Sequence, residues 1–213
     1  MTDRQEEEGP VEIAIVGDLT DSEADLTDRL LGVESGGECT IYFDSPGGSP
    51  YCAVSLMTLI KMRNLKATGI VTGECSSATL WPFAACHRRI VTPFSVMLFH
   101  PMRWQSEENV GLAEASEWAR HFAQLEQDMD TLLAQLFGVP AEMMRKWIIP
   151  GRYVTGREMA EAGMAELSEL DDLHRAAFDP GSSQRKPTTS NGNGAATSGR
   201  SPAKSTAARR RRR

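Results

Sequence analysis

The sequence predicts an α/β fold with a mainly parallel sheet, on the basis of two patterns. In the first half of the chain, short apolar runs of strand length alternate with segments whose apolar residues recur at helical spacing. Such alternation implies helical crossovers between parallel strands. The second half instead carries one long helical pattern. The length of 213 residues suits one domain with appendages.

The first strand and the first helix are predicted at the start of this alternation. Val11–Val16 is a short apolar run, and the turn-forming residues after it end the strand. Thr20 and Glu23 have the spacing of a capping box, so a helix is expected from Asp21. Gly32 is expected to end this helix.

Two further strands and helices follow. Cys39–Phe43 is predicted to be the second strand, and residues 44–48 (DSPGG) break it abruptly. Residues 51–63 repeat apolar side chains at helical period and predict the second helix. Residues 67–71 predict the third strand, after which a helix is expected to follow Ser77.

Short strands and a long helix complete the predicted fold. Residues 90–91 and 95–99 are strand candidates. An apolar stripe with alternating steps of four and three residues predicts a helix of about 25 residues, closed by Gly138. The stripe consists of Trp118, Phe122, Leu125, Met129, Leu132 and Leu136. It either packs on the sheet of its own chain or protrudes and pairs with a neighbouring subunit. A last helix is expected from Thr155, which has capping-box spacing with Glu158.

Composition and cysteine usage exclude several classes of protein. Hydrophobic residues make up 40% and charged residues 24%, and no apolar run reaches the ~18–20 residues that span a bilayer. Residues 1–10, an acidic and flexible segment, resemble neither a secretory signal nor a transit peptide. The four cysteines form no CxxC pair, so neither a disulfide framework nor a zinc site is expected. We therefore expect a cytoplasmic protein without a membrane partner.

The net charge of −6 combines an acidic body with a basic tail. Residues 180–213 hold nine of the 23 Lys and Arg residues and no acidic residue, which leaves 14 basic against 29 acidic residues, a net charge of −15, in residues 1–179. The tail lacks Val, Ile, Leu, Met and aromatic residues, so it is expected to be disordered. It could be a solvated extension, bind acidic surfaces, or contact nucleic-acid phosphates non-specifically through its terminal arginines. Sequence-specific nucleic-acid binding is not expected, because no aromatic residues are interleaved.

Three motifs lie where predicted strands end. Residues 45–48 (SPGG) can expose backbone N–H groups as a cradle for an anion. Ser76 and Ser77 stand at the start of a predicted helix, and His100 ends a strand candidate. Each motif has an ordinary structural explanation: a turn, an N-cap and a strand-end histidine. Ligands of open parallel sheets, however, bind beyond the carboxyl ends of the strands.

The order of these motifs resembles that of the proteolytic subunit of the Clp protease (ClpP). In that family an SPGG loop is followed by a GxxxS motif, here Gly73 to Ser77, and then by a VMIHQP-like strand, here VMLFHP with His100. IAIVGDLTDSEAD and GREMAEAGMAE also resemble family segments, and the long helix lies where the family has its handle helix. The resemblance covers residues 11–167. It implies a ClpP-like serine peptidase domain over residues 11–179, with the ClpP/crotonase fold: a spiral of parallel βαβ units with a protruding handle helix.

The resemblance also implies particular site residues. Ser77, the fourth residue after Gly73, would be the nucleophile, and His100 would be its general base. Backbone N–H groups of Gly48 and Ala78 would form the oxyanion hole. No metal and no organic cofactor is implied, and no substrate-binding residue is indicated.

One residue of the family pattern is missing. Gly151 stands where the catalytic aspartate of the family is expected. Losing the role of that aspartate costs serine proteases roughly 10⁴ in turnover. A carboxylate from Glu142, Asp171 or Asp172, a backbone carbonyl, or a Ser–His dyad could replace it. Restoring an aspartate at position 151 is expected to raise turnover.

The expected function is that of a ClpP-like serine endopeptidase acting on peptides or unfolded proteins. The alternative, favoured by Gly151, is a catalytically silent ClpP-like subunit that co-assembles with active paralogues. A crotonase-like acyl-CoA enzyme on the same fold is a third possibility, but that family has no need for a Ser/His pair. The resemblance implies self-assembly into rings. A partnership with an AAA+ unfoldase is not expected, because only residues 1–10 precede the first strand.

Overall fold

The sheet consists mainly of parallel strands that neighbour one another in sequence order. A computed structural model describes residues 10–103, 105 and 109–178. The main path of the sheet is formed by β1 (Val11–Asp18), β2 (Glu38–Gly47), β3 (Lys66–Cys75), β4 (Arg88–Val91) and β7 (Glu166–Leu167), and every pair along it is parallel. β5 (Val96–Phe99) lies beside the end of β3 and pairs antiparallel with β6 (Arg152–Thr155). The predicted α/β fold with a mainly parallel sheet is confirmed.

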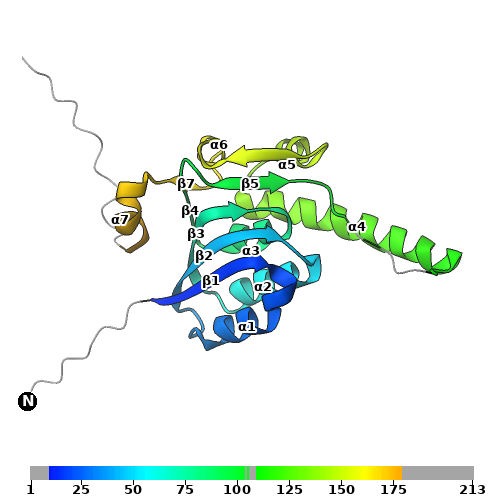
Figure 1. Cartoon of the computed structure of the whole chain (residues 1–213), viewed down its shortest axis with the longest axis horizontal. Coiled ribbons are helices and arrows are strands. Elements are labelled where there is room, and N and C mark those ends of the chain that lie inside the picture. Colours follow the sequence, from blue (N-terminus) through cyan, green and yellow to red (C-terminus); the bar gives the residue numbers. More distant parts are fainter. Residues whose placement is uncertain (1–9, 104, 106–108, 179–213) are drawn as a thin grey trace, which may run out of the picture. The chain divides into compact units, whose positions relative to one another are not determined.

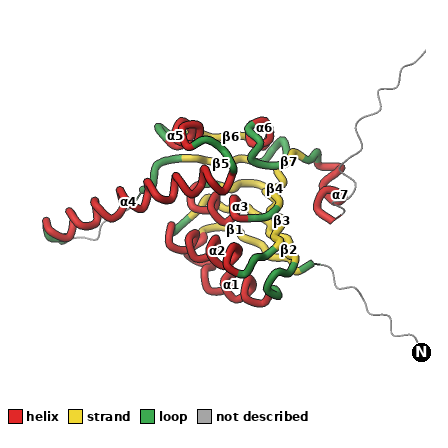
Figure 2. The backbone as a smooth tube through the Cα atoms, turned by 180° about the vertical axis from the view of Figure 1, so that it is seen from behind, coloured by secondary structure: helices red, strands yellow, loops and turns green. Residues whose placement is uncertain are grey.

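Helices connect the strands and cover one face of the sheet. α1 (Leu19–Gly32) and α2 (Pro50–Met62) follow β1 and β2, and a 3₁₀ turn, η1 (Ser77–Thr79), leads from β3 into α3 (Leu80–Ala85). α2 packs between α1 and α3, and α4 (Leu112–Phe137) packs next to α3. Figure 2 shows these four helices in front of the strands. The remaining helical elements are α5 (Ala141–Ile148), α6 (Gly156–Glu161), η2 (Leu170–Asp172) and α7 (Leu173–Phe178).

The first helix begins earlier than the sequence predicts. α1 starts at Leu19 because Asp18, not Thr20, is its N-cap: the Asp18 carboxylate accepts a hydrogen bond from the N–H of Thr20 at 2.8 Å. The Thr20 hydroxyl accepts instead from the N–H of Ser49 at 3.1 Å, and so joins α1 to the segment before α2. The capping box predicted at Thr20 is therefore wrong, whereas the one predicted at Thr155 is present at the start of α6.

β2 and β3 continue beyond their predicted ends. β2 extends to Gly47, with a register shift against β3 between Phe43 and Ser45. β3 extends to Cys75. The predicted break at residues 44–48 is thus an irregular strand end, which bends while it stays paired with its neighbours. Both extensions reach the carboxyl-terminal edge of the sheet, where the candidate site lies.

The two halves of α4 have different surroundings. The helix spans 26 residues and ends at Gly138. Its buried side chains all lie in the C-terminal half: Met129, Leu133, Ala134 and Phe137. Leu112, at the other end, is 86% exposed. Figure 1 shows the N-terminal half extending well beyond the sheet, as expected of a handle helix.

The buried face of α4 departs from the predicted stripe. Leu133 and Phe137 are buried, while Leu132 and Leu136 are only partly buried. The five steps of the stripe cover 18 residues, an average of 3.6 per turn, so the stripe stays on one face of a straight helix. After Met129 the core therefore meets α4 beside the predicted stripe, at Leu133 and Phe137.

One cluster of buried side chains fills the space between the sheet and the helices. The rings of Phe43 from β2 and Phe83 from α3 meet edge to face in it, with centroids 5.3 Å apart. All four cysteines are buried and unpaired. Within the described part of the chain, no helix is both long and apolar enough to cross a membrane. The predicted acidic N-terminal segment, apart from Pro10, and the predicted basic tail over residues 180–213 lie outside the described residues.

Candidate active site

Ser77 and His100 meet at the carboxyl-terminal edge of the sheet. Ser77 directly follows Ser76 in the turn after β3, and His100 is the first residue after β5. β5 runs parallel to the end of β3, with Glu74 opposite Val96, so the two strands end side by side. Nε2 of His100 lies 2.8 Å from Oγ of Ser77, which is hydrogen-bonding distance.

The other ring nitrogen of His100 is held by the main chain. Nδ1 lies 2.6 Å from the carbonyl oxygen of Pro101. A carbonyl oxygen can only accept, so Nδ1 carries the proton, and the lone pair of Nε2 faces the hydroxyl of Ser77. In this tautomer the imidazole can take a proton from Ser77. The ring is therefore oriented without a side-chain acid.

Gly151 lies against His100 but has no side chain to offer it. A Cβ at position 151 would stand 3.5 Å from Cβ of His100, an ordinary van der Waals contact. The φ angle of Gly151 is +122°, a conformation that residues with a side chain rarely adopt. A side chain at this position would have room, but the backbone beneath it would be strained.

The other carboxylates considered as substitutes lie elsewhere. Glu142 is exposed on α5, 3.7 Å from the ammonium group of Lys146. Asp172 lies 3.2 Å from the guanidinium group of Arg175, and Asp171 is exposed beside it. None of these three lines the pocket that contains His100. The sequence left open whether a carboxylate, a backbone carbonyl or neither replaces the missing catalytic aspartate. The structure places a backbone carbonyl, that of Pro101, next to the imidazole.

Ser77 occupies a strained turn that is braced by the SPGG segment. Its φ is +54°, in the left-handed region that non-glycine residues seldom enter. A sharp, strained strand-to-helix turn also presents the nucleophile of α/β-hydrolases. Gly47 passes so close that a Cβ on it would lie 2.7 Å from Cβ of Ser77, so this position needs a glycine. The buried Thr79 hydroxyl donates to Oγ of Ser45 at 2.9 Å and joins the turn to the end of β2.

The two residues before Ser77, Cys75 and Ser76, are buried and are not available as nucleophiles. The Ser76 hydroxyl is fully buried and accepts a hydrogen bond from the N–H of Leu98 at 2.9 Å, which ties the turn to β5. Cys75 is also buried, and burial raises the pKa of its thiol well above the ordinary value, so it is not available as a thiolate. Ser77 is thus the one nucleophile of this turn that faces His100.

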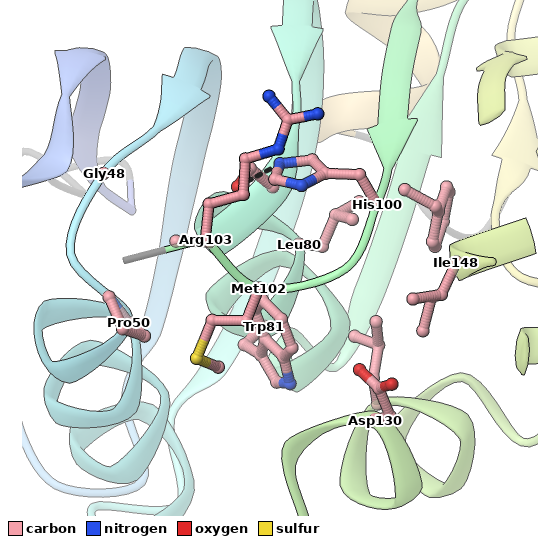
Figure 3. A pocket seen from close by; sticks show the side chains of 13 residues that line it. Gly48, Pro50, Leu80, Trp81, His100, Met102, Arg103, Asp130 and Ile148 are labelled. Carbon is pink, nitrogen blue, oxygen red and sulfur yellow. Dashed lines mark hydrogen bonds between the residues drawn. The ribbon is translucent and has the colours of Figure 1, made fainter. Parts of the chain in front are cut away.

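A pocket of about 130 Å³ opens beside the Ser77–His100 pair. Gly48 and Ala78, the two residues expected to form an oxyanion hole, line the same pocket. Its remaining walls are mostly apolar and come from α2, α3, β5, α4 and α5: Pro50, Leu80, Trp81, Phe99, Met102, Leu133 and Ile148. Arg103 and Asp130 are its other charged members, as Figure 3 shows.

Two hydrogen bonds fix the wall that α4 contributes. The indole N–H of Trp81 donates to the backbone oxygen of Met129 at 2.9 Å. The carboxylate of Glu126 accepts from the N–H of Met102 at 2.6 Å, which holds the segment after His100 against the helix. These bonds join α3 and the segment after β5 to α4 beside the pocket, which Trp81 and Met102 both line.

Asp130 is the one carboxylate that lines this pocket in the described part of the chain. Burial raises its pKa from 3.8 to about 6; the nearby Glu126 adds to the rise and Arg145 opposes it. Sequence reasoning missed this residue. The available signal was a carboxylate directly after Met129, at the point where the apolar stripe of the long helix enters the core. Among the described residues, no group of His, Cys, Asp and Glu side chains is placed to hold a metal ion.

Comparison with known proteins shows a family and a solved structure that the chain resembles. A model of the Clp protease family matches residues 11–167. Among solved structures, a point mutant of ClpP1 from Listeria monocytogenes superposes with a TM-score of 0.66 at 20% sequence identity, over 76% of this chain and 92% of that chain. None of the curated proteins matches the sequence. At this identity the structural likeness supports the fold alone.

Proposed function

This chain belongs to the Clp protease family, and from that premise we propose that it is a serine endopeptidase with Ser77 as nucleophile and His100 as general base. The observation that carries the proposal is the 2.8 Å contact between Nε2 of His100 and Oγ of Ser77, with Nδ1 hydrogen-bonded to Pro101. Nucleophile, base and orienting group are the three parts that acyl transfer needs.

The first half of the reaction follows from this geometry. Oγ of Ser77 attacks the peptide carbonyl carbon while its proton passes to Nε2 of His100. The negative charge that develops on the carbonyl oxygen is stabilised by the N–H groups of Gly48 and Ala78. Losing one donor of this kind typically costs about 10² to 10³ in turnover. The imidazolium then gives its proton to the departing amine, and an acyl-enzyme remains.

The second half repeats these steps with water. His100 takes a proton from a water molecule, which attacks the acyl carbon, and Ser77 leaves with that proton. Membership of the Clp protease family supports a peptide chain as the substrate, and the Ser–His pair supplies the proton transfers that its hydrolysis needs. Unfolded protein segments present such chains.

The carbonyl of Pro101 replaces part of what a catalytic carboxylate does. It fixes the productive tautomer of His100, but a neutral dipole stabilises the imidazolium less than a full negative charge does. In serine proteases, substituting the orienting aspartate lowers turnover by roughly 10⁴, because the histidine then adopts the wrong tautomer. Because Pro101 enforces the right one, we expect the deficit caused by Gly151 to be smaller than this.

Covalent labelling tests the proposal. A fluorophosphonate should modify the folded protein on the peptide that contains Ser77, and Ser77→Ala should abolish the adduct. Ser116→Ala is a suitable control because Ser116 is exposed on α4, where its hydroxyl donates to the backbone oxygen of Leu112 and does not line the pocket. Ser76 is a poor control, since removing its hydroxyl leaves the N–H of Leu98 without its partner. A folded protein that forms no adduct at Ser77 contradicts the proposal.

The second candidate function is that of a catalytically silent subunit, and Gly151 is the observation that favours it. Such a subunit would keep the fold and assemble with active members of the family without cleaving peptides itself. Absence of labelling at Ser77, combined with co-sedimentation with an active Clp peptidase subunit, would support this candidate. Labelling that depends on both Ser77 and His100 would exclude it.

A further inference from the structure

The Asp130 carboxylate stands in a largely apolar part of the candidate active site. Figure 3 shows it rising from α4 toward the space bounded by Met102, Trp81 and Ile148. These side chains line the same pocket as Ser77 and His100. A carboxylate with apolar walls loses hydration that it would keep at an open surface, so it needs a compensating partner.

No such partner is found for it in the described part of the chain. Neither a hydrogen bond nor an ion pair of Asp130 is present among the described residues. The charged groups around it come from three segments. Glu126 lies one turn earlier on α4, and Arg145 on α5 acts on Asp130 at long range without forming an ion pair. Arg103, after β5, extends past His100 at the other end of the pocket (Figure 3).

The position of this carboxylate is set by rigid surroundings. The residue before it, Met129, is buried and accepts the indole hydrogen bond of Trp81. Glu126, one turn earlier, holds the backbone of Met102. A binding group on a helix that is held by such contacts is suited to select among ligands, because it cannot move away from a mismatched one.

We infer that Asp130 selects a positively charged side chain at the residue whose carbonyl Ser77 attacks, so that the enzyme cleaves after lysine or arginine. This inference rests on the proposed function, because it assigns substrate specificity to the same site. The aliphatic stem of such a side chain packs on the apolar walls, among them Leu133 and Ile148, and its charged end reaches the carboxylate. A carboxylate in the specificity pocket of a serine protease has this effect in trypsin.

Selectivity should depend on pH in a defined direction. With a pKa of about 6, Asp130 is largely neutral at pH 5 and largely ionised at pH 8. The preference for a cationic over an apolar side chain therefore rises between these values, and a bound cation moves the transition to lower pH. Any effect of pH on the catalytic step itself is common to both substrates, so it cancels in the ratio of their rates. Glu126 and Arg145 are the charged groups whose fields act on this transition, and Arg103 is the other charged side chain that lines the pocket.

Two peptidyl diphenyl phosphonates that differ only in lysine or leucine at the reactive position test the inference. The measured quantity is the rate of covalent labelling of Ser77 by each reagent in the whole protein at pH 8. We expect the lysine reagent to react faster, and Asp130→Asn to lower the lysine-to-leucine ratio about 10- to 100-fold, the value of one hydrogen bond to a charged group. Asp128→Asn is the matched control, because Asp128 is exposed on α4 and hydrogen-bonded to Gln124.

The outcomes separate the two proposals. If Ser77 is labelled but leucine is preferred, and Asp130→Asn leaves the ratio unchanged, the inference on specificity is wrong and the proposed function stands. If neither reagent nor a small fluorophosphonate labels Ser77 in the folded protein, both are wrong. If Asp130→Asn and Asp128→Asn lower both rates equally without altering the ratio, Asp130 has a structural role only, and the inference is again overturned.

Discussion

Each ring nitrogen of His100 has a different kind of partner, and this determines what a change at position 151 can achieve. Nε2 faces the Ser77 hydroxyl, while Nδ1 is already engaged by the carbonyl of Pro101. A carboxylate introduced at position 151 would have to displace that carbonyl. It would also have to sit on a backbone with φ of +122°.

Gly151→Asp is therefore expected to lower stability and to leave turnover unchanged or reduced, contrary to the gain that the sequence alone predicts. The strained backbone costs about 1–3 kcal/mol of unfolding free energy. Thermal unfolding and the hydrolysis of a fluorogenic peptide measure the two effects. Gly151→Ala is the control, since it has the same strain and no carboxylate. A turnover at least tenfold above that of the alanine variant would show that an aspartate can replace the Pro101 carbonyl.

Asp130→Asn should stabilise the protein at pH 8 but not at pH 4. Because burial raises the pKa of Asp130 from 3.8 to about 6, the folded state binds its proton more tightly than the unfolded chain does. The contribution of the Asp130 carboxyl group to stability is complete at pH values below its pKa in the unfolded chain. It is lost as the pH rises through its pKa in the folded state. The ionised carboxylate then costs about 1 kcal/mol, after allowance for solvent screening at a partly exposed site. Equal melting temperatures of the unmodified protein and of Asp130→Asn at pH 8 would contradict a raised pKa of Asp130.

At the scale of the elements, the helices and strands that could be predicted from the sequence are those with a local repeat of apolar residues. The strand Val11–Val16 and the long helix were predictable because burial repeats along each of them with its own period. The continuation of β2 to Gly47 was not, since it depends on pairing with β1 and β3, which lie far away in sequence. The N-cap at Asp18 was missed because two polar residues compete for one helix start, and tertiary contacts of Thr20 decide between them.

The same reasoning explains what could be predicted of the site. Ser77, His100 and Gly151 were identified from motif order, and the structure places them next to one another. The carbonyl of Pro101 carries no sequence signal, because every residue has one. Asp130 belongs to a helix distant in sequence from the motifs, and only the packing of α4 against α3 brings it to the pocket.

The irregular end of β2 should be as important to activity as the side chains of the site. Gly47→Ala would place a Cβ within 2.7 Å of Cβ of Ser77, on a backbone with φ of +115°. Displacing a nucleophile by about 1 Å can cost about 10² in rate. We therefore expect fluorophosphonate labelling of Gly47→Ala to slow at least to that extent. Gly32→Ala, where an added Cβ meets nothing within 4 Å, should label like the unmodified protein. Equal rates for the two variants would mean that the turn adjusts freely.

At the scale of the whole molecule, the two halves of α4 differ: the C-terminal half packs in the core, and the N-terminal half extends beyond it. Met129 and Phe137 are buried within the chain, whereas Leu112 is largely exposed. Trp118 and Phe122, from the predicted stripe, are partly buried. A helix that extends an apolar stripe beyond its own domain is expected to pack against another copy of the chain.

We therefore predict that the chain sediments as an assembly of many subunits. Phe122→Asp should shift the distribution toward smaller species, because it places a charge on the stripe. Gln124→Asp adds the same charge at an exposed position of the same helix, and it should leave the distribution unchanged. Sedimentation velocity at micromolar concentration measures both. A monomer in the unmodified protein would contradict the prediction.

One uninterrupted helix carries both the selecting carboxylate and the extended arm. Asp130 and Trp118 are twelve residues apart on it, which at 1.5 Å per residue is about 18 Å along a single rod. The core and the hydrogen bonds to Trp81 and Met102 hold the part of the helix around Asp130 within one protomer. The outer arm continues this fixed part without a break, so the same contacts that shape the pocket wall also set the direction in which a protomer offers its arm to a neighbour.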